Sequence, residues 1–329
     1  MRTIFFRNRP TITATSSIAG PKECSGSIGK FIQTKLSDDM YGEKTFEKAE
    51  SRMLFTSIKN SIINAGKNES DVDAIISGDL LDQIIASTFS ARNFDTGYLG
   101  VYNACATFAE ALTLGATLID GNYMNNVVCA ASSHFSSAER QYRFPLELGC
   151  TRPPQSQWTV TGAGSCVLAS DGKGPKITAA TIGKIVDYGI TDANNMGAAM
   201  APAALNTLLT LFNDTKTNPE DYDLIVSGDL GTLGSRILKD LIWEKGFDIE
   251  KQHVDCGELV YNIAEQEYQG GSGAGCSALV FSSYLFDKLK KGKLKKIIIM
   301  ATGALLSSLS SQQGESIPGI AHAVVVEGE

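Results

Sequence analysis

Residues 71–80 read Asp71-Val-Asp-Ala-Ile-Ile-Ser-Gly-Asp-Leu80, and the stretch returns in the second half as Asp221-Tyr-Asp-Leu-Ile-Val-Ser-Gly-Asp-Leu230. Seven of the ten positions are identical. A repeat of this kind indicates a duplicated architecture, which has to be recognised before single elements are assigned. The chain has 329 residues, so we expect two copies of one unit, over residues 1–172 and 173–329.

Weaker matches follow the repeat in the same order. Cys105 opens an expected helix that ends at Gly121, and Cys276 opens another that ends at Gly292, with a spacing of sixteen residues in both halves. Small residues surround both cysteines, as in helices that must approach a neighbour closely. We therefore expect these two helices to form a central, buried pair.

The hydrophobic pattern alternates between two kinds of segment. Residues 46–65 and 203–213 have helical apolar spacing, whereas 74–77, 127–131, 224–227 and 297–301 are short apolar runs typical of strands buried on both faces. Alternating β and α units favour mainly parallel sheets with right-handed crossovers. The pattern predicts an α/β protein in which two such sheets enclose the central helices.

Composition excludes several classes of function. The formal net charge of −7 argues against nonspecific nucleic-acid binding. The seven cysteines lack Cys-x-x-Cys spacing, and the three histidines are too scattered to indicate a metal triad. The longest apolar run, near 297–306, is about half of a membrane span, and residues 1–10 do not resemble a signal peptide. We expect an intracellular protein that needs no cofactor.

Cys105 is the first candidate for chemistry. It lies at the start of an expected helix, where the positive end of the helix dipole favours a thiolate and lowers the pKa of a cysteine. The alternative is a small core residue at a tight helix contact.

The segment 132–145 follows an expected strand, at the sheet edge where ligands of α/β proteins bind. It carries His134, Glu139, Arg140 and Arg143. Two arginines three residues apart share one face of a helix and suit the recognition of a carboxylate. The alternative is a solvated helix with Glu–Arg pairs.

The segment 187–202 mixes carboxylates, amides and small residues ahead of a helix. Asp187 and Asp192 offer oxygen ligands to a cation such as calcium, but the spacing is not that of an EF-hand. Capping of the following helix by Asp192, Asn194 or Asn195 is the alternative. The pattern assigns no metal-ligand set.

These features resemble, over essentially the whole chain, the thiolase / ketoacyl-synthase superfamily, and within it the stage V sporulation protein AD family. The resemblance depends on the order of the following strings: Ile18-Ala-Gly-Pro-Lys-Glu23, Ser77-Gly-Asp-Leu-Leu81, Ser132-Ser-His134, Ala138-Glu-Arg-Gln141, Thr159-Val-Thr-Gly162, Gly189-Ile-Thr-Asp192, Met200-Ala-Pro-Ala-Ala204, Ala301-Thr-Gly-Ala-Leu-Leu-Ser307, Glu315-Ser-Ile-Pro318 and Ile320-Ala-His322. It implies a thiolase-like duplicated fold with α/β/α/β/α layers.

The resemblance also implies a history of catalysis. Condensing enzymes of the superfamily pair their cysteine with a histidine after the strand that is here 224–227, and with a histidine or asparagine in the loop that is here 270–275. This chain has Gly228-Asp229 at the first position and only Gly, Ser and Ala in the second. Claisen chemistry needs such groups as acid, base or oxyanion stabiliser. We expect a retained cleft without catalysis; the alternative is an acyltransferase with Cys105 as nucleophile and His134 as base.

The sporulation family implies a protein that binds dipicolinic acid, free or as its calcium chelate, during uptake into the developing spore and release on germination. It further implies cytoplasmic synthesis, a peripheral place on the spore inner membrane beside integral membrane proteins, and, from the superfamily, a homodimer. Cys105 and His134 carry over to the ligand site by their positions. Arg140 and Arg143 are added for the carboxylates of the ligand, and Asp187 and Asp192 for calcium.

Overall fold

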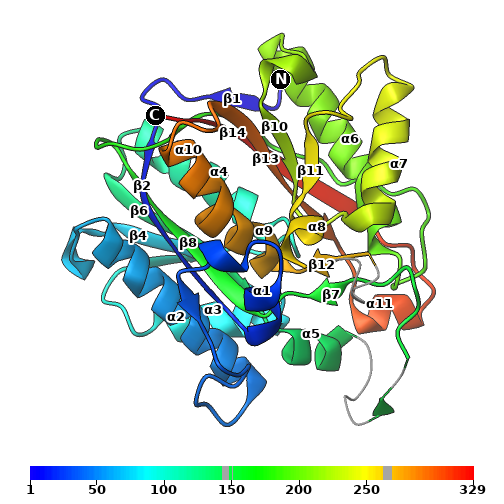
Figure 1. Cartoon of the computed structure of the whole chain (residues 1–329), viewed down its shortest axis with the longest axis horizontal. Helices are drawn as coiled ribbons and strands as arrows, with labels where there is room; N and C mark the ends of the chain where they lie inside the picture. The colour runs from blue at the N-terminus through cyan, green and yellow to red at the C-terminus, as the bar shows by residue number, and fades with distance from the viewer. Residues whose placement is uncertain (143–147, 150, 262–268) are drawn as a thin grey trace.

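The computed structural model describes residues 1–142, 148, 149, 151–261 and 269–329 (Figure 1). In the first half, neighbouring strands follow the order β2 (Thr11–Ala19), β8 (Gly162–Ala169), β6 (Asn126–Ser133), β4 (Ala74–Gly78) and β5 (Gly97–Gly100). β8 is antiparallel to both of its neighbours, and the other pairs are parallel. Strands β2, β4, β5 and β6 therefore run in one direction and β8 in the other.

The second half repeats this topology. Its order is β9 (Lys176–Thr181), β14 (Gly319–Glu327), β13 (Lys296–Ala304), β10 (Leu224–Ser227) and β11 (His253–Asp255), and again only the second strand of the series opposes the rest. The halves join where Thr11 of β2 pairs with Lys176 of β9. The expected mainly parallel α/β fold is confirmed. The expected boundary at residue 172 falls in the connection between β8 and β9.

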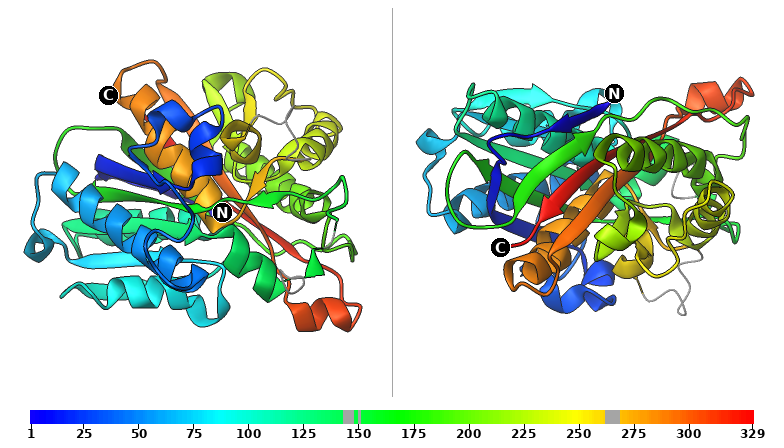
Figure 2. Two further views of the ribbon diagram at one scale, coloured as in Figure 1. Left: turned by 60° about the horizontal axis from the view of Figure 1, so that its bottom comes forward. Right: turned by 90° about the horizontal axis from the view of Figure 1, so that it is seen from above.

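Helices form three layers around the sheets (Figures 1 and 2). α2 (Phe46–Asn64) and α3 (Ile85–Ala91) cover the outer face of the first sheet, and α6 (Met196–Thr215), with α7 (Gly231–Trp243) beside it, covers the outer face of the second. α4 (Thr107–Asp120) packs between the sheets, against both of them and against α9 (Ala274–Val280). The central pair opened by Cys105 and Cys276 is thus present.

Small residues permit the close packing of the central layer. A Cβ atom on Gly115 of α4 would lie 2.6 Å from the Cys129 sulfur in β6, and one on Gly164 of β8 would lie 2.1 Å from the Ala278 carbonyl oxygen of α9. Both distances are well inside van der Waals contact, so larger residues would push the helices off the sheet.

The two central helices differ in detail. α4 begins two residues after Cys105, whereas Cys276 lies inside α9. The second helix is not one regular helix to Gly292, because α9 passes through a π-helical segment (Phe281–Leu285) into α10 (Phe286–Lys290). Elsewhere the predicted spans hold closely: α2 covers all but the last residue of the expected 46–65, and β10 covers 224–227. α6 begins earlier than expected, because the Asn195 side chain caps it by accepting the Ala198 N–H.

The other helices and strands are short. They are β1 (Thr3–Phe5), α1 (Pro21–Ser25), β3 (Thr34–Lys35), α5 (Phe135–Tyr142), β7 (Trp158–Thr159), α8 (Cys256–Val260), β12 (Gly271–Ser272) and α11 (Ser308–Gln312), together with 3₁₀ turns at 29–31, 69–71, 82–84 and 219–221. Within the described ranges, every helix is too short or too polar to cross a bilayer.

Candidate ligand pocket at the Cys105 turn

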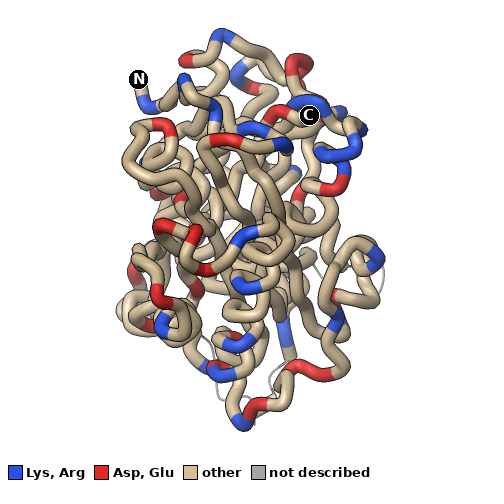
Figure 3. Tube along the Cα trace, turned by 90° about the vertical axis from the view of Figure 1, so that its left-hand side faces the viewer, with Lys and Arg blue, Asp and Glu red and all other residues tan. Residues whose placement is uncertain are grey.

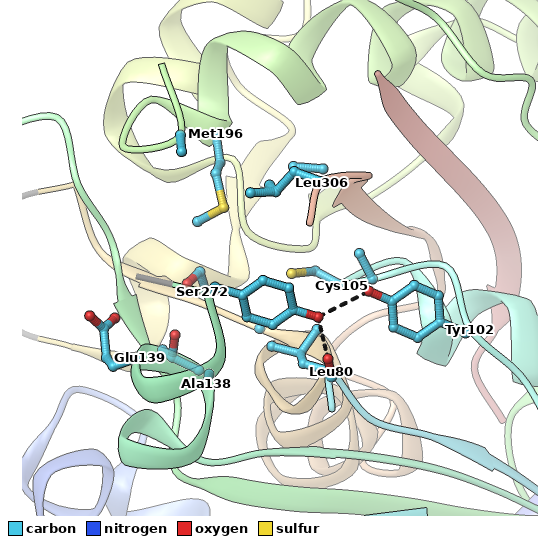
Figure 4. A pocket seen from close by; sticks show the side chains of 14 residues that line it. Leu80, Tyr102, Cys105, Ala138, Glu139, Met196, Ser272 and Leu306 are labelled. Atoms are coloured by element: carbon cyan, nitrogen blue, oxygen red, sulfur yellow. Dashed lines mark hydrogen bonds between the residues drawn. The ribbon is translucent and has the colours of Figure 1, made fainter. Parts of the chain in front are cut away.

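A small pocket lies where the carboxyl ends of the strands of both halves meet (Figure 4). Its volume is about 60 Å³. Its lining is formed by Leu80, Tyr102, Ala104, Cys105, Ala138, Glu139, Tyr142, Thr159, Ala193, Met196, Ser272, Gly273, Ala304 and Leu306. Aliphatic and aromatic side chains dominate, with a few polar groups among them, as in binding sites for small organic molecules.

Cys105 is presented by a strained turn. Ala104 has a φ of +49°, in the left-handed region that costs a residue with a Cβ roughly 1–2 kcal/mol. The turn places Cys105 two residues before α4, with 6% of its surface exposed. Strain of this kind persists where the surrounding structure holds it, and it marks functional sites.

Asp229 changes the chemistry of this cysteine. The Asp229 carboxylate is the charged group that acts most strongly on the Cys105 thiol. Burial, followed by the negative charge of Asp229, raises the pKa of Cys105 well above that of an ordinary cysteine. The helix N-terminus was expected to favour a thiolate, but burial and the adjacent carboxylate outweigh it. The thiol is therefore held in its protonated, weakly nucleophilic form.

Asp229 is itself firmly held. One carboxylate oxygen accepts the Thr302 hydroxyl at 2.9 Å, and the other accepts the Gly273 N–H at 3.0 Å. The Gln157 amide donates to the Asp229 carbonyl at 2.7 Å. Burial raises the pKa of Asp229 to about 6, against these hydrogen bonds, which lower it. The carboxylate is thus mostly ionised at neutral pH and fixed toward the thiol.

The two positions expected, from the superfamily resemblance, to correspond to catalytic groups hold an aspartate and a backbone N–H. Asp229 follows β10, and the backbone N–H of Gly273, with a φ of +109°, stands in the 270–275 loop. The two groups act on the pKa of the thiol in opposite directions: the Asp229 carboxylate raises it and the Gly273 N–H lowers it. His322 is engaged elsewhere: its Nδ1 accepts the Gly183 N–H at 3.1 Å, and its Nε2 lies 3.3 Å from the Asn103 amide nitrogen.

Two tyrosines supply hydroxyl groups at the pocket wall. The Tyr102 and Tyr142 hydroxyls lie 3.1 Å apart, and Tyr142 also donates to the Leu80 carbonyl oxygen (Figure 4). Burial raises the pKa of both phenols, so they remain neutral hydrogen-bonding groups.

An ion pair lies behind the pocket wall. Arg152 Nη1 is 2.7 Å from Glu139 Oε1, and the two side chains are only 13% and 11% exposed. The guanidinium also lies 5.3 Å from the ring centre of Trp158, which stacks on Phe135 at 3.8 Å. Glu139 lines the pocket, and Arg152 reaches the pocket wall through this contact. Arg152 is not predictable from the sequence, because its segment has no periodic pattern.

His134 is enclosed away from the pocket. Its Nε2 lies 2.9 Å from the Asp39 carbonyl oxygen, its Nδ1 accepts the Ser136 N–H at 3.1 Å, and its ring packs against Phe46 at 5.3 Å. Burial lowers its pKa, so the ring stays neutral. Both nitrogens have structural partners, and the ring does not line the pocket.

Arg140 of the predicted site does not join Cys105. α5 turns Ala138, Glu139 and Tyr142 to the pocket, and successive residues of a helix point about 100° apart. Arg140 instead pairs with Glu47 of α2. Arg143 lies outside the described residues.

The two predicted aspartates lie at the rim or beyond it. Asp187 is exposed and accepts the Ser316 hydroxyl at 2.5 Å and the Gly189 N–H at 2.8 Å, which lower its pKa. Asp192 accepts the Asn194 N–H at 2.9 Å and precedes the pocket residue Ala193. Of the five predicted residues that the structure describes, only Cys105 lies in the pocket wall. The described ranges contain no cluster of three or more His, Cys, Asp or Glu side chains suited to a metal ion.

Comparison with known proteins gives a consistent result at the level of sequence. The family profile of stage V sporulation protein AD matches residues 1–327. The stage V sporulation protein AD of Bacillus subtilis (strain 168) is 39% identical over 327 residues, which cover 99% of this chain and 96% of that protein.

Solved structures with low sequence identity share the fold. 3-Oxoacyl-[acyl-carrier-protein] synthase III of Aquifex aeolicus VF5 aligns with a TM-score of 0.59 and 14% identity, over 97% of this chain and 99% of that chain. Cerulenin-bound OleA of Xanthomonas campestris aligns with a TM-score of 0.60 and 14% identity, over 98% of both chains. The chain therefore has the ketoacyl-synthase III type of fold.

Proposed function

The chain belongs to the stage V sporulation protein AD family, and we propose that its pocket binds dipicolinic acid without catalysing acyl transfer. The observation that carries the proposal is the contact between Cys105 and Asp229. A condensing enzyme needs a thiolate and a proton-transferring partner. A buried carboxylate beside the sulfur disfavours the thiolate and leaves the pocket as a binding site.

The chemistry of the wall supports a small aromatic acid. The aliphatic and aromatic lining of the pocket suits a planar ring. The Tyr102 hydroxyl can turn its proton from Tyr142 to a carboxylate oxygen of the ligand, and the guanidinium of Arg152 adds a positive charge behind the wall.

Charge favours the calcium chelate over the free dianion. Glu139 and Asp229 bring two carboxylates to the site, and Arg152 brings one guanidinium. A dianion adds to this negative charge, whereas the one-to-one chelate with calcium is neutral. Glu139 also offers an oxygen of the kind that calcium prefers.

In the cell, we propose that this binding serves uptake of dipicolinic acid into the developing spore and its release on germination. The protein then acts at the spore inner membrane as a peripheral component beside integral membrane proteins. Membership of the sporulation family supports this role.

Isothermal titration calorimetry with dipicolinate, with and without calcium, tests the binding proposal. Wild-type protein should bind the calcium chelate more tightly than the free acid, and Cys105→Ala should retain binding with a modest loss. Arg152→Gln should weaken binding by roughly 10- to 100-fold, the usual value of a hydrogen bond to a charged group. Arg140→Gln is the matched control, because Arg140 lies outside the pocket wall and should leave affinity unchanged.

Two outcomes contradict the proposal. If dipicolinate does not bind, either with or without calcium, dipicolinic acid is not the ligand of this pocket. Intact-mass detection of an acyl adduct on Cys105 after incubation with acyl-CoA would instead establish the acyltransferase.

A further inference from the structure

The chain carries a dense group of lysines far from the pocket. Its formal net charge is −7, yet six lysines fall within residues 288–296, where Asp287 is the nearest acidic neighbour in the sequence. α10 ends at Lys290, and the following turn folds back so that the Lys293 N–H donates to the Lys288 carbonyl oxygen at 2.9 Å. The turn therefore concentrates these positive charges.

A lysine from the first half joins the group. Lys30 Nζ and Lys288 Nζ each lie 5.3 Å from the ring centre of Phe31, and Phe31 packs edge-on against Tyr284 at 5.0 Å. Lys30, Lys290 and Lys291 line one surface hollow. We define the lysine surface as Lys30, Lys288, Lys290, Lys291, Lys293 and Lys295.

Few acidic groups neutralise this surface. Asp287 pairs with Lys291 at 2.6 Å, and Glu327 lies near Arg9 and Lys296, at 3.6 and 3.9 Å. Figure 3 shows basic segments gathered around the C-terminus, where β14 ends next to this turn. Lys290, Lys293 and Lys295 are exposed.

We propose that the lysine surface docks the protein on a bilayer that contains anionic phospholipids. Clusters of four to eight basic residues are attracted to such membranes, with about 1 kcal/mol, or roughly fivefold in affinity, for each lysine near the surface. The group consists of lysines, whose compact ammonium charges suit diffuse attraction to many headgroups, whereas nucleic-acid recognition favours the guanidinium fork of arginine. The inference deepens the peripheral membrane location proposed above and rests on it for the identity of the membrane.

Docking in this way leaves the pocket free. β13 begins at Lys296, beside the lysine surface, and ends at Ala304, which lines the pocket. Eight residue steps of a strand span ~26 Å. The ligand site thus lies at the opposite end of the sheets from the bilayer and remains open to the aqueous compartment.

Vesicle co-sedimentation of the full chain tests the proposal. Wild-type protein should bind vesicles of 30% phosphatidylglycerol in phosphatidylcholine at low salt, release at 300 mM NaCl, and ignore pure phosphatidylcholine. Lys290→Gln/Lys293→Gln/Lys295→Gln should weaken binding roughly 100-fold. Lys44→Gln/Lys48→Gln/Lys245→Gln is the matched control, because it removes the same charge from exposed positions elsewhere and should retain most of the affinity.

Ligand titration separates this inference from the proposed function. The first triple variant should keep the dipicolinate affinity of the wild type, and Arg152→Gln should keep wild-type vesicle binding. The inference is overturned if wild-type protein ignores anionic vesicles at low salt, or if both triple variants lose affinity equally. Retention on an immobilised acidic peptide without vesicle binding would likewise overturn it, by assigning the surface to an acidic protein.

Discussion

Asp229 opposes the ionisation of Cys105, whereas the neutral thiol favours the ionised form of Asp229. The hydrogen bonds around Asp229 allow the pair to be tested with little change of shape. An asparagine at 229 would keep its oxygen toward the Gly273 N–H and direct its amide to the Thr302 hydroxyl, which accepts as well as donates. The substitution removes a negative charge beside the sulfur while preserving the surrounding contacts.

We predict that Asp229→Asn lowers the pKa of Cys105 and speeds its alkylation by iodoacetamide at pH 8 about tenfold, which corresponds to roughly one pKa unit. The measurement is the pH profile of the alkylation rate, followed by peptide mass spectrometry at Cys105. Asp187→Asn serves as control, because Asp187 is exposed and does not line the pocket. An unchanged profile for Asp229→Asn would show that burial alone suppresses the thiolate.

Buried carboxyls give the second prediction at this scale. Burial raises the pKa of Glu50 to about 8 and that of Asp255 to about 7. A raised folded-state pKa means that folding retains a proton, so this contribution to stability is present below pH 4.5 and is lost as the pH rises toward 8. Glu50 accepts hydrogen bonds from Ser132 and Ser137 and is almost fully buried, so its ionisation is costly.

We therefore expect the free energy of unfolding to fall between pH 6 and pH 8.5, and Glu50→Gln to reduce that fall by about 1–3 kcal/mol, at about 1.4 kcal/mol per pKa unit. Urea denaturation at both pH values measures it. Glu47→Gln is the control: hydrogen bonding to Arg140 lowers the pKa of Glu47 despite partial burial, so its contribution is lost at acid pH instead. Equal slopes for Glu50→Gln and wild type would contradict the assignment.

At the scale of the elements, the repeated decapeptide carries three aspartates in each half. The first two have the same structural role in both halves, and the third has a different role in each. Asp71 and Asp221 each complete a capping box with the asparagine three residues earlier. Asp73 accepts the Asn125 and Asn126 N–H groups at 2.7 and 2.8 Å, and Asp223 accepts the corresponding Lys295 and Lys296 N–H groups. In each half, one carboxylate thus clamps the start of the neighbouring parallel strand.

We predict that Asp73→Ala and Asp223→Ala each destabilise the fold by about 1–3 kcal/mol, since each leaves two backbone donors without their carboxylate partner. The double variant should show additive losses, because the clamps lie in different halves and share no partner. Chemical denaturation measures both effects, with Asp171→Ala in the connection between β8 and β9 as control. If only one of the two single variants loses stability, only that aspartate stabilises the fold.

The third aspartate of the repeat, Asp79 in the first half and Asp229 in the second, shows which features could be predicted from the sequence and which could not. Strand and helix spans followed from local periodicity, and the duplication followed from the repeat. Asp79 and Asp229 look equivalent in sequence, but Asp79 accepts the Leu81 and Ser87 N–H groups, whereas Asp229 contacts Cys105. The difference depends on which residue of the other half lies opposite, and no local pattern contains that information.

The site residues illustrate the same limit. The phase of α5 decides that Glu139 faces the pocket and Arg140 faces α2, but the sequence does not say on which side the pocket lies. His134 was selected for its place after a strand, yet the Asp39 carbonyl, from a segment 95 residues earlier, occupies its Nε2. Arg152 reaches Glu139 from a segment without periodicity. Long-range contacts therefore determine the pocket wall.

At the scale of the whole molecule, the sheets keep an open edge at β5. In the described part of the chain β5 ends the strand order and pairs with β4, which leaves its other edge without a neighbouring strand. Residues 97–100 are Gly-Tyr-Leu-Gly, and Leu99 is 44% exposed. Natural proteins protect open edges with charges, prolines or a covering element, and β5 has neither charge nor proline.

We predict a homodimer in which β5 pairs with β5 of a second copy and joins the first sheets of both subunits. Leu99→Lys should convert a dimer of twice 35.1 kDa to a monomer of 35.1 kDa in multi-angle light scattering, because a charge on an edge strand opposes edge-to-edge pairing. Ile63→Lys, which also adds a lysine at an exposed apolar position but on α2, should leave the dimer intact. A wild-type mass of 35.1 kDa at tens of micromolar would contradict the dimer, and a dimer that survives Leu99→Lys would place the interface on another face.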